Sequence, residues 1–398
     1  MSSRKIETWH AAGLIDVETR AALLAYEAEH ARPLALWAVF GIGALAIGLG
    51  IISVVAANWE DVPGQVRLAI HLVLVAGLVG AVFAREDKIA QATPWALEAL
   101  VFVASALGLT FFGHLGQVYQ TSSPLWEPIA MWLALFAPLL LLTGRAWPAA
   151  TLLIGGVTLC VWEYYDAVAG SVFGRAREEV SFVWLAAVTS APLLFAPLAA
   201  WLRGDRSPII VAARERPDFW RRLKQWALVY AVTGASLLAI LASLDAFRDG
   251  DPGILDAGGQ FVRAVIAIIV GGLVVVARPG VPGHMSGAIF TGTGLTAWLA
   301  ASFSGIDVAA GLLFMALWVS VAGAALQAGW RAVFQLAVAV VAVRLIVLSF
   351  ELASDLLLSG FGLIVSGLMI LAIAWVAYRV SREYAPERND NTDTKDAP

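Results

Sequence analysis

Long apolar runs recur along almost the whole chain, and this repetition restricts the possible folds more than any other feature. The run from Trp95 to Gly113 is typical, because its nineteen residues carry a single charged side chain, Glu98. A helix of about 20 apolar residues crosses a bilayer, inside which every backbone N–H and C=O needs a partner. The runs are continuous rather than alternating, which favours helices over a barrel. With 60% hydrophobic and 14% charged residues, the sequence predicts an all-α integral membrane protein.

Twelve runs are candidates for membrane-spanning segments, so about twelve transmembrane helices are expected. The fourth run is the weakest, because it is short and surrounded by Pro124, Pro128 and Pro138. An earlier start, a kinked helix and a partly re-entrant segment are the three interpretations open for it. The runs are Leu34–Ala57, Val66–Ala84, Trp95–Gly113, Ile129–Leu142, Ala146–Trp162, Ser181–Leu202, Gln225–Leu244, Phe261–Ala277, Ser286–Phe303, Ile306–Leu326, Ala332–Phe350 and Leu356–Tyr378.

The distribution of Lys and Arg predicts how the chain is oriented in the membrane. If all twelve runs span and the N-terminus is cytoplasmic, 20 of the 26 basic residues lie in cytoplasmic segments and Arg344 lies within a span. The outer loops hold the remaining five, which are Arg67, Arg175, Arg177, Arg248 and Arg263. So strong a bias between alternate loops predicts an even number of spans and cytoplasmic termini.

The N-terminal segment reads as a pair of short helices outside the membrane. Ile6 and Trp9 share one helix face, Gly13 is a helix stop, and Asp16 can cap a second helix. Such a hairpin is too small to bury a core of its own. The predicted segments are a cytoplasmic helix-turn-helix hairpin at residues 1–32, the polytopic transmembrane domain at 33–380, and a polar, disordered cytoplasmic tail at 381–398.

A basic stretch at residues 203–224 separates the sixth and seventh runs and contains Phe219 and Trp220. Its simplest interpretation is a cytoplasmic loop that lies on anionic lipid head groups. A docking site for a protein partner, here or on the N-terminal hairpin, is the alternative. The net charge of −4 and the lack of a basic soluble module argue against nucleic acid as a partner. The lipid bilayer is therefore the expected partner.

Charged side chains inside the spans are the first candidates for function, because each costs roughly 2.5–3.5 kcal/mol at mid-helix on insertion scales. Arg344 lies within the eleventh run, and Glu351 and Asp355 follow at spacings that place all three on one stripe of a continuous helix. An internal ion pair that fixes helix packing and a substrate or ion site are both open for them. Two interpretations are open for His71 in the second run and for His114 at the end of the third. Each is either a hydrogen-bonded histidine at the membrane interface or a ligand of a bound group.

The predicted topology places these groups, with several others, on the outer side of the membrane. They outline an outward-facing polar cavity walled by the first, second, third and eleventh spans, with ordinary residues of an outer interface as the alternative. The candidates are Asn58, Trp59, His71, His114, Gln117, Tyr119, Gln120, Arg344, Glu351 and Asp355.

Motifs that carry chemistry are missing from the sequence. It contains no GxxxxGK[ST] phosphate loop, no HExxH and no GxSxG at a strand-to-helix turn. Cys160 is the single cysteine, and no three histidines or carboxylates occur at a metal-ligand spacing. The sequence therefore predicts no catalytic residue, no cofactor and no metal, and an enzyme is the less favoured class.

Several short motifs carry a resemblance to a known family. They are the helix pair at Trp9–Asp16, AANW at Ala56–Trp59, GQVYQ at Gly116–Gln120, LW at Leu125–Trp126 and the stretch from Arg344 to Asp355. In their order and spacing they resemble the bacterial predicted membrane proteins called domain of unknown function 2157, mainly over residues 5–165. The resemblance implies a multi-pass protein of the bacterial inner membrane, and it brings no activity and no site residues.

Three functions are consistent with these features. The leading one is a polytopic inner-membrane protein that binds or transports a small solute or a lipid-linked molecule through an outward-facing polar cavity. Twelve spans with a long basic loop after the sixth resemble the layout of many secondary transporters. The alternatives are a non-catalytic scaffold or envelope-assembly partner, and a membrane enzyme that acts on a lipid-linked substrate.

Overall fold

The computed structural model describes Ile6, Ala46 and residues 9–30, 62–92, 94–170, 181–203, 216–243, 253–303, 307–352 and 360–384. All regular structure in these residues is helical, with thirteen α-helices and two short 3-10 helices and no strand, so the all-α prediction is confirmed for them. The chain divides into two compact units, residues 1–67 and 68–398.

In the first unit the predicted helix signals are confirmed. The N–H of Gly13 donates to His10 O, and that of Leu14 donates to Trp9 O. These two hydrogen bonds close the end of a helix when a glycine takes a positive φ, which is 69° at Gly13. The next helix, α2 (Val17–His30), starts behind Asp16, whose carboxylate accepts the N–H of Thr19 at 2.8 Å. Hydrogen bonds from the Thr19 side chain and backbone lower the pKa of Asp16.

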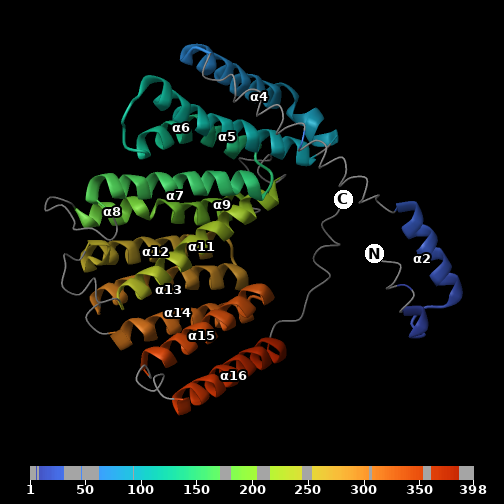
Figure 1. The fold of residues 1–398 in the computed structure, drawn as a ribbon, viewed down its shortest axis with the longest axis vertical. Helices are drawn as coiled ribbons and strands as arrows, with labels where there is room; N and C mark the ends of the chain where they lie inside the picture. The colour runs from blue at the N-terminus through green and yellow to red at the C-terminus, as the bar shows by residue number, and fades with distance from the viewer. Residues whose placement is uncertain are drawn as a thin grey trace. The chain divides into compact units, whose positions relative to one another are not determined.

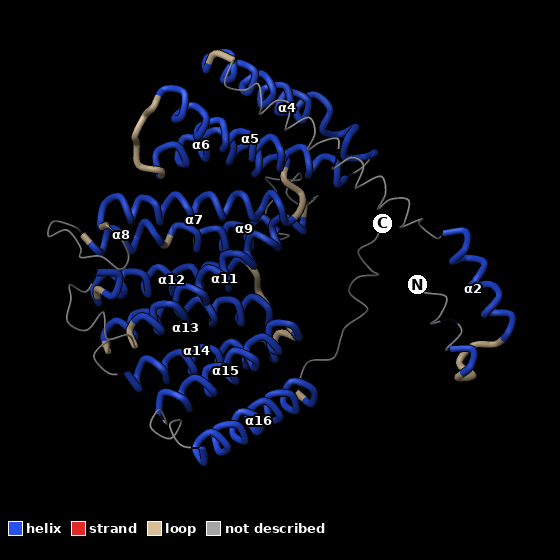
Figure 2. Tube along the Cα trace, in the orientation of Figure 1, coloured by secondary structure: helices blue, strands red, loops and turns tan. Residues whose placement is uncertain are grey.

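The second unit is a series of helices that lie side by side, most of them packed on the next helix in the chain (Figure 1). Figure 2 shows that short connections join many of them. α11 departs from this order, since it packs on α7, α9 and α13. The helices are α4 (Gly64–Ala92), which starts in the first unit, α5 (Pro94–Tyr119), α6 (Trp126–Thr143), α7 (Trp147–Ala169), α8 (Phe182–Thr189), α9 (Phe195–Arg203), α11 (Pro217–Leu241), α12 (Ala257–Ala277), α13 (Val281–Ser302), α14 (Asp307–Gln327), α15 (Arg331–Leu352) and α16 (Gly360–Glu383).

Eight segments in the described residues are long and apolar enough to cross a membrane. They correspond to the second to eighth and the tenth of the predicted runs. Runs nine, eleven and twelve form the helices α13, α15 and α16. The first run, Leu34–Ala57, lies outside the described residues apart from Ala46. For the weak fourth run, the earlier start is observed, because α6 begins at Trp126 and contains Pro138 within its 18 residues. A multi-span protein is confirmed, and the number twelve stays a prediction.

The sixth run is interrupted in the middle. α8 ends at Thr189, a 3-10 turn occupies Ala191–Leu194, and α9 begins at Phe195. Pro192 lies in this turn and has no N–H to continue the α-helical ladder. Breaks of this kind are tolerated at membrane depth when side chains satisfy the backbone groups that they release.

Glycines bring α12 and α13 close together. A Cβ on Gly287 would lie 2.7 Å from Gly271 O, and a Cβ on Gly294 would lie 2.9 Å from the Cα of Ala264. Gly292, on the same helix, has open space beside it. Small residues at such positions let two backbones approach. Close packing of α12 on α13 therefore depends on Gly287 and Gly294 and not on Gly292.

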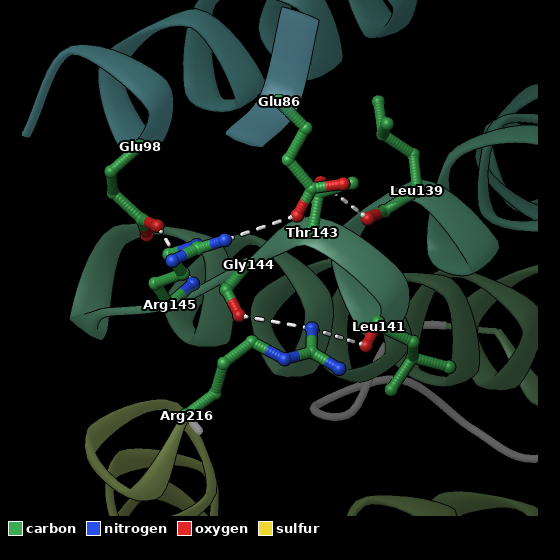
Figure 3. A network of polar contacts seen from close by, with 8 residues as sticks. All are labelled: Glu86, Glu98, Leu139, Leu141, Thr143, Gly144, Arg145 and Arg216. Atoms are coloured by element: carbon green, nitrogen blue, oxygen red, sulfur yellow. Dashed lines mark hydrogen bonds and ion pairs between the residues drawn. The ribbon is translucent and has the colours of Figure 1, made fainter. Parts of the chain in front are cut away.

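A polar clamp holds the turn between α6 and α7 (Figure 3). Ala146, at the N-cap position of α7, has no side chain that can bond the free N–H groups. Glu98 of α5 supplies this cap, because its carboxylate accepts the N–H of Arg145 and that of Ala149, each at 2.9 Å. The Arg145 guanidinium also lies 3.3 Å from Glu86 of α4.

Arg216 closes the same turn from the other side. Its Nη1 donates to Leu141 O at 2.9 Å and to Gly144 O at 3.3 Å, and so binds carbonyls that end α6. Phe219 and Trp220 follow it in the first turn of α11, and both are buried in the core. The prediction of a loop over residues 203–224 is wrong from Pro217 on, because α11 begins there and buries Phe219 and Trp220. Residues 204–215 lie outside the described residues, so their place on lipid head groups stays a prediction.

Candidate functional site

A cavity of about 600 Å³ lies between α7, α11, α12 and α13, beside the break that follows α8. Apolar side chains such as Ile154, Leu193 and Ala267 form most of its lining. Two hydroxyls of the lining, those of Thr151 and Thr293, donate to carbonyls of their own helices. Ligand pockets in proteins have about this volume, roughly 300–1,000 Å³, and are mostly apolar with a few placed polar groups.

The mouth of the cavity opens through the apolar outside of the helix series. Leu159, Val229 and Leu237 line the cavity and are still 46%, 50% and 54% exposed. In a multi-span protein, exposed leucine and valine in the middle of a span face lipid tails. With α7 and α11 crossing the membrane, as their length and composition predict, this opening would face the hydrocarbon of the bilayer.

Among the described residues that line the cavity, Arg263 of α12 is the one with a charged side chain. It is partly buried, and its Nη2 donates to the hydroxyl of Thr189. That hydroxyl in turn donates to Leu185 O at 2.8 Å, so its oxygen is free to accept from the guanidinium. Arg263 thus lies at the C-terminal end of α8, where the helix dipole favours a positive charge.

The break after α8 explains how the site is assembled. In a continuous helix Thr189 O would accept the N–H of Leu193, but that N–H donates to Ser190 O at 3.0 Å. The Tyr230 hydroxyl donates to Thr189 O instead, at 2.5 Å, and accepts a bond from Trp162 Nε1 at 3.2 Å. Tyr230 of α11 and Arg263 of α12 therefore both bond to Thr189 at the end of α8, and Trp162 of α7 bonds to the Tyr230 hydroxyl.

A second, much smaller hollow of about 10 Å³ lies next to Arg263. Gln260, which is 2% exposed, lines it and donates from Nε2 to Ile254 O at 2.6 Å. Its Oε1 has no hydrogen-bond partner among the residues that the structure describes. A hollow of this size holds roughly one water. Arg263 lines both hollows, so the polar end of the site is where the two meet.

Of the site residues expected from the sequence, the structure brings His71 and His114 together. Their Nδ1 atoms are 3.3 Å apart, and His71 Nε2 is 3.0 Å from Leu107 O. A carbonyl only accepts, so His71 carries its proton on Nε2 when neutral, and His114 donates from Nδ1. The pair joins α4 to α5 and is not part of the cavity lining.

Three further candidates lie where α5 ends. Gln117 and Tyr119 are exposed in its last turn, and Gln120 follows with a φ of 52°. Thr121 N donates to Gly116 O at 3.1 Å, which closes the helix in the same way as at Gly13. These residues form a helix end, and none of them lines the cavity.

Of the remaining candidates, two lie on α15 and three lie outside the described residues. Arg344 is partly buried on this helix, and Glu351 lies in its last turn, where its side chain is outside the described residues. Asn58, Trp59 and Asp355 also lie outside the described residues. α15 packs on α14 and α16, toward the other end of the series from α4 and α5 (Figure 1). A single polar cavity formed by these residues stays a prediction.

Arg263 is not among the site residues expected from the sequence. It was counted with the outer loops because it is the third residue of the run Phe261–Ala277 and so lies at the edge of that run. In the structure α12 begins earlier, behind Asp256, which accepts the N–H of Gly259 at 2.6 Å. Asp256 ahead of the apolar run is a helix-start signal, and it would have placed Arg263 in the second turn of the helix rather than at its edge.

The comparison with known proteins concerns the N-terminal part of the chain. Residues 7–149 match the family described as Predicted membrane protein (DUF2157). The resemblance found in the sequence is thus confirmed for this region. No curated protein and no solved structure gives a significant match. The DUF2157 region includes Glu86, Glu98 and Arg145 of the polar clamp. All residues that line the cavity follow it in the chain.

Proposed function

We propose that this protein binds a lipid-like molecule within the bilayer, with the apolar chain of the ligand in the cavity between α7, α11, α12 and α13. The observation that carries the proposal is the sideways mouth of the cavity at Leu159, Val229 and Leu237. A ligand that enters there comes from the hydrocarbon and keeps its apolar chain out of water. An apolar lining suits such a molecule better than a small hydrophilic solute, whose polar groups would find few partners.

Filling the cavity should remove binding. Gly234 lines the cavity, and a Cβ placed on it meets nothing within 4 Å, so Gly234→Leu fills space without a clash. We expect the variant to lower photolabelling by a neutral long-chain methyl ester with a diazirine group by about five-fold or more. Labelled peptides of the wild-type protein, identified by mass spectrometry, should come from α7 and α11.

Gly323→Leu is the matched control. Gly323 lies on α14, has equally open space beside it and is not part of the lining. This variant should label as strongly as the wild-type protein. Equal labelling of both variants, or wild-type labels scattered over all helices, would mean that lipid contacts the surface only and would refute the proposal.

We further propose that twelve spans place both termini, the N-terminal hairpin and the tail in the cytoplasm of a bacterial cell, with the protein in the inner membrane. The bias of Lys and Arg between alternate loops supports this orientation. In a Cys160→Ala background, Gln117→Cys should react in intact cells with a membrane-impermeant thiol reagent. Gln327→Cys, at the opposite side in this topology, should react only after the cells are opened. The reverse pattern would contradict the orientation.

Binding is proposed here in preference to catalysis and to a purely structural role. A scaffold does not need an open cavity of this size, and docking of a partner on the hairpin or on the 203–224 stretch is compatible with binding. Within the described residues no three His, Cys, Asp or Glu side chains gather as metal ligands. That the protein is not an enzyme stays a prediction.

A further inference from the structure

We infer that Arg263 binds the head group of the ligand, so that the ligand is an anionic amphiphile, with a carboxylate or phosphate head on an apolar chain. This inference rests on the proposed function and names the class of ligand that the same cavity takes. The arginine lies where the large apolar cavity meets the small hollow beside Gln260. A molecule with its chain in the cavity would bring its head to this point.

The charge of Arg263 is not balanced by the described part of the protein. No carboxylate of the described residues lies within 4.0 Å of its guanidinium, and the hydrogen-bond partner that it has is the neutral hydroxyl of Thr189. Arginine stays protonated in proteins, so it cannot escape this cost by losing its proton. A charge inside a span without a counter-ion is expensive, and such residues mark ligand or ion sites. An anionic head group would supply the missing counter-charge.

The guanidinium also has donors to spare. It carries five N–H groups, and one bond, to Thr189, is found for it within the described residues. The planar fork of the remaining donors matches the two oxygens of a carboxylate or a phosphate. A neutral head group would accept fewer of these bonds and would leave the charge uncompensated.

The surrounding side chains hold the guanidinium in place for such a ligand. Thr189 accepts from it, Tyr230 of α11 donates to Thr189 O, and Trp162 of α7 in turn donates to the Tyr230 hydroxyl. The buried Gln260 adds an acceptor, Oε1, that lacks a partner. A water in the small hollow, or a hydroxyl of the head group, would satisfy it. The site thus offers an anchor for the anion and a polar contact beside it.

The test compares two ligands that have the same apolar chain, one with a charged head group and one with a neutral head group. Palmitic acid and its methyl ester compete with the photolabel for the full-length protein in nanodiscs of neutral lipid, in mildly alkaline buffer that ionises the acid. We expect the acid to compete at a roughly 10- to 100-fold lower concentration than the ester. Arg263→Gln should abolish this preference and leave the ester unchanged, and Arg263→Lys should retain part of it.

Each result decides between the two proposals. If both ligands compete equally with the wild-type protein, or if Arg263→Gln keeps the preference, the head-group assignment is wrong while lipid binding stands. If neither competes and Gly234→Leu labels normally, the proposed function itself fails. Displacement of the acid by inorganic phosphate, with the ester unaffected, would mean a site for a small free anion. The comparison in the wild-type protein alone decides the matter if Arg263→Gln does not fold.

Discussion

Replacing Trp132 with alanine should lower the free energy of unfolding by about 3–5 kcal/mol. This side chain of α6 is 1% exposed, and its Nε1 donates to Ser105 O of α5 at 2.8 Å. Its ring stacks on Phe136 with centroids 6.1 Å apart. The ring also packs against Gly156 of α7, where an added Cβ would lie 2.4 Å from the ring. Alanine would leave a large cavity at the junction of three helices and would remove the hydrogen bond to Ser105 O.

Leu135→Ala is the control for the Trp132 variant. Leu135 is on the same helix and 65% exposed, so its loss removes a side chain that faces outward. Unfolding by SDS in mixed micelles is followed through tryptophan fluorescence, for which 15 of the 16 tryptophans remain in Trp132→Ala and all 16 in Leu135→Ala. The transition should shift strongly for Trp132→Ala and little for Leu135→Ala. Similar shifts for the two variants would contradict the packing described for α6.

Glu98→Ala should be the second most damaging of the proposed substitutions. The buried carboxylate of Glu98 accepts the N–H groups of Arg145 and Ala149, and alanine would leave both without a partner. Each buried unsatisfied donor costs roughly 1–3 kcal/mol, so we expect a loss of about 2–6 kcal/mol in the same SDS assay. Because α7 starts at this clamp and lines the cavity, photolabelling should fall as well.

Glu86→Ala tests whether the loss of stability depends on the position of the carboxylate rather than on its charge. Glu86 carries the same charge and lies 3.3 Å from the Arg145 guanidinium, but this ion pair is partly exposed. Exposed pairs contribute about 0–1 kcal/mol, so the variant should stay close to wild-type stability. Equal losses for Glu86→Ala and Glu98→Ala would show that Glu98 does not act as the cap of α7.

The helices themselves could be predicted from the sequence because their signals are local. Asp16 begins α2 and Gly13 ends the helix before it through bonds to residues only a few positions away. The apolar runs predicted eight of the observed candidate spans for the same reason, since a helix in lipid satisfies its backbone within itself. The cap of α7 could not be predicted in this way, because Glu98 is 47 residues from Arg145 in the chain.

The candidate site was harder to predict from the sequence than the helices were. His71 and His114 were singled out as polar residues in apolar runs, and the structure joins them, although they are not part of the cavity. Arg263 was counted with an outer loop because it lies at the edge of its predicted run, whereas α12 begins earlier, at Ala257. The break at Pro192 also has a visible signal, but the bond from Tyr230 to Thr189 depends on the packing of α11 against α8 and could not be read from either segment.

The sequence by itself determined that the chain forms apolar helices long enough to span a membrane, and which stretches of the chain form them. Which side of each helix faces protein was decided by the tertiary structure. On α11 the neighbouring residues Leu237 and Leu238 have the same side chain, yet they are 54% and 3% exposed. In a bilayer, lipid tails are as apolar as leucine, so hydrophobicity does not distinguish the two faces. Close packing at Gly271 and Gly287, and polar contacts such as that of Arg263 with Thr189, distinguish them instead.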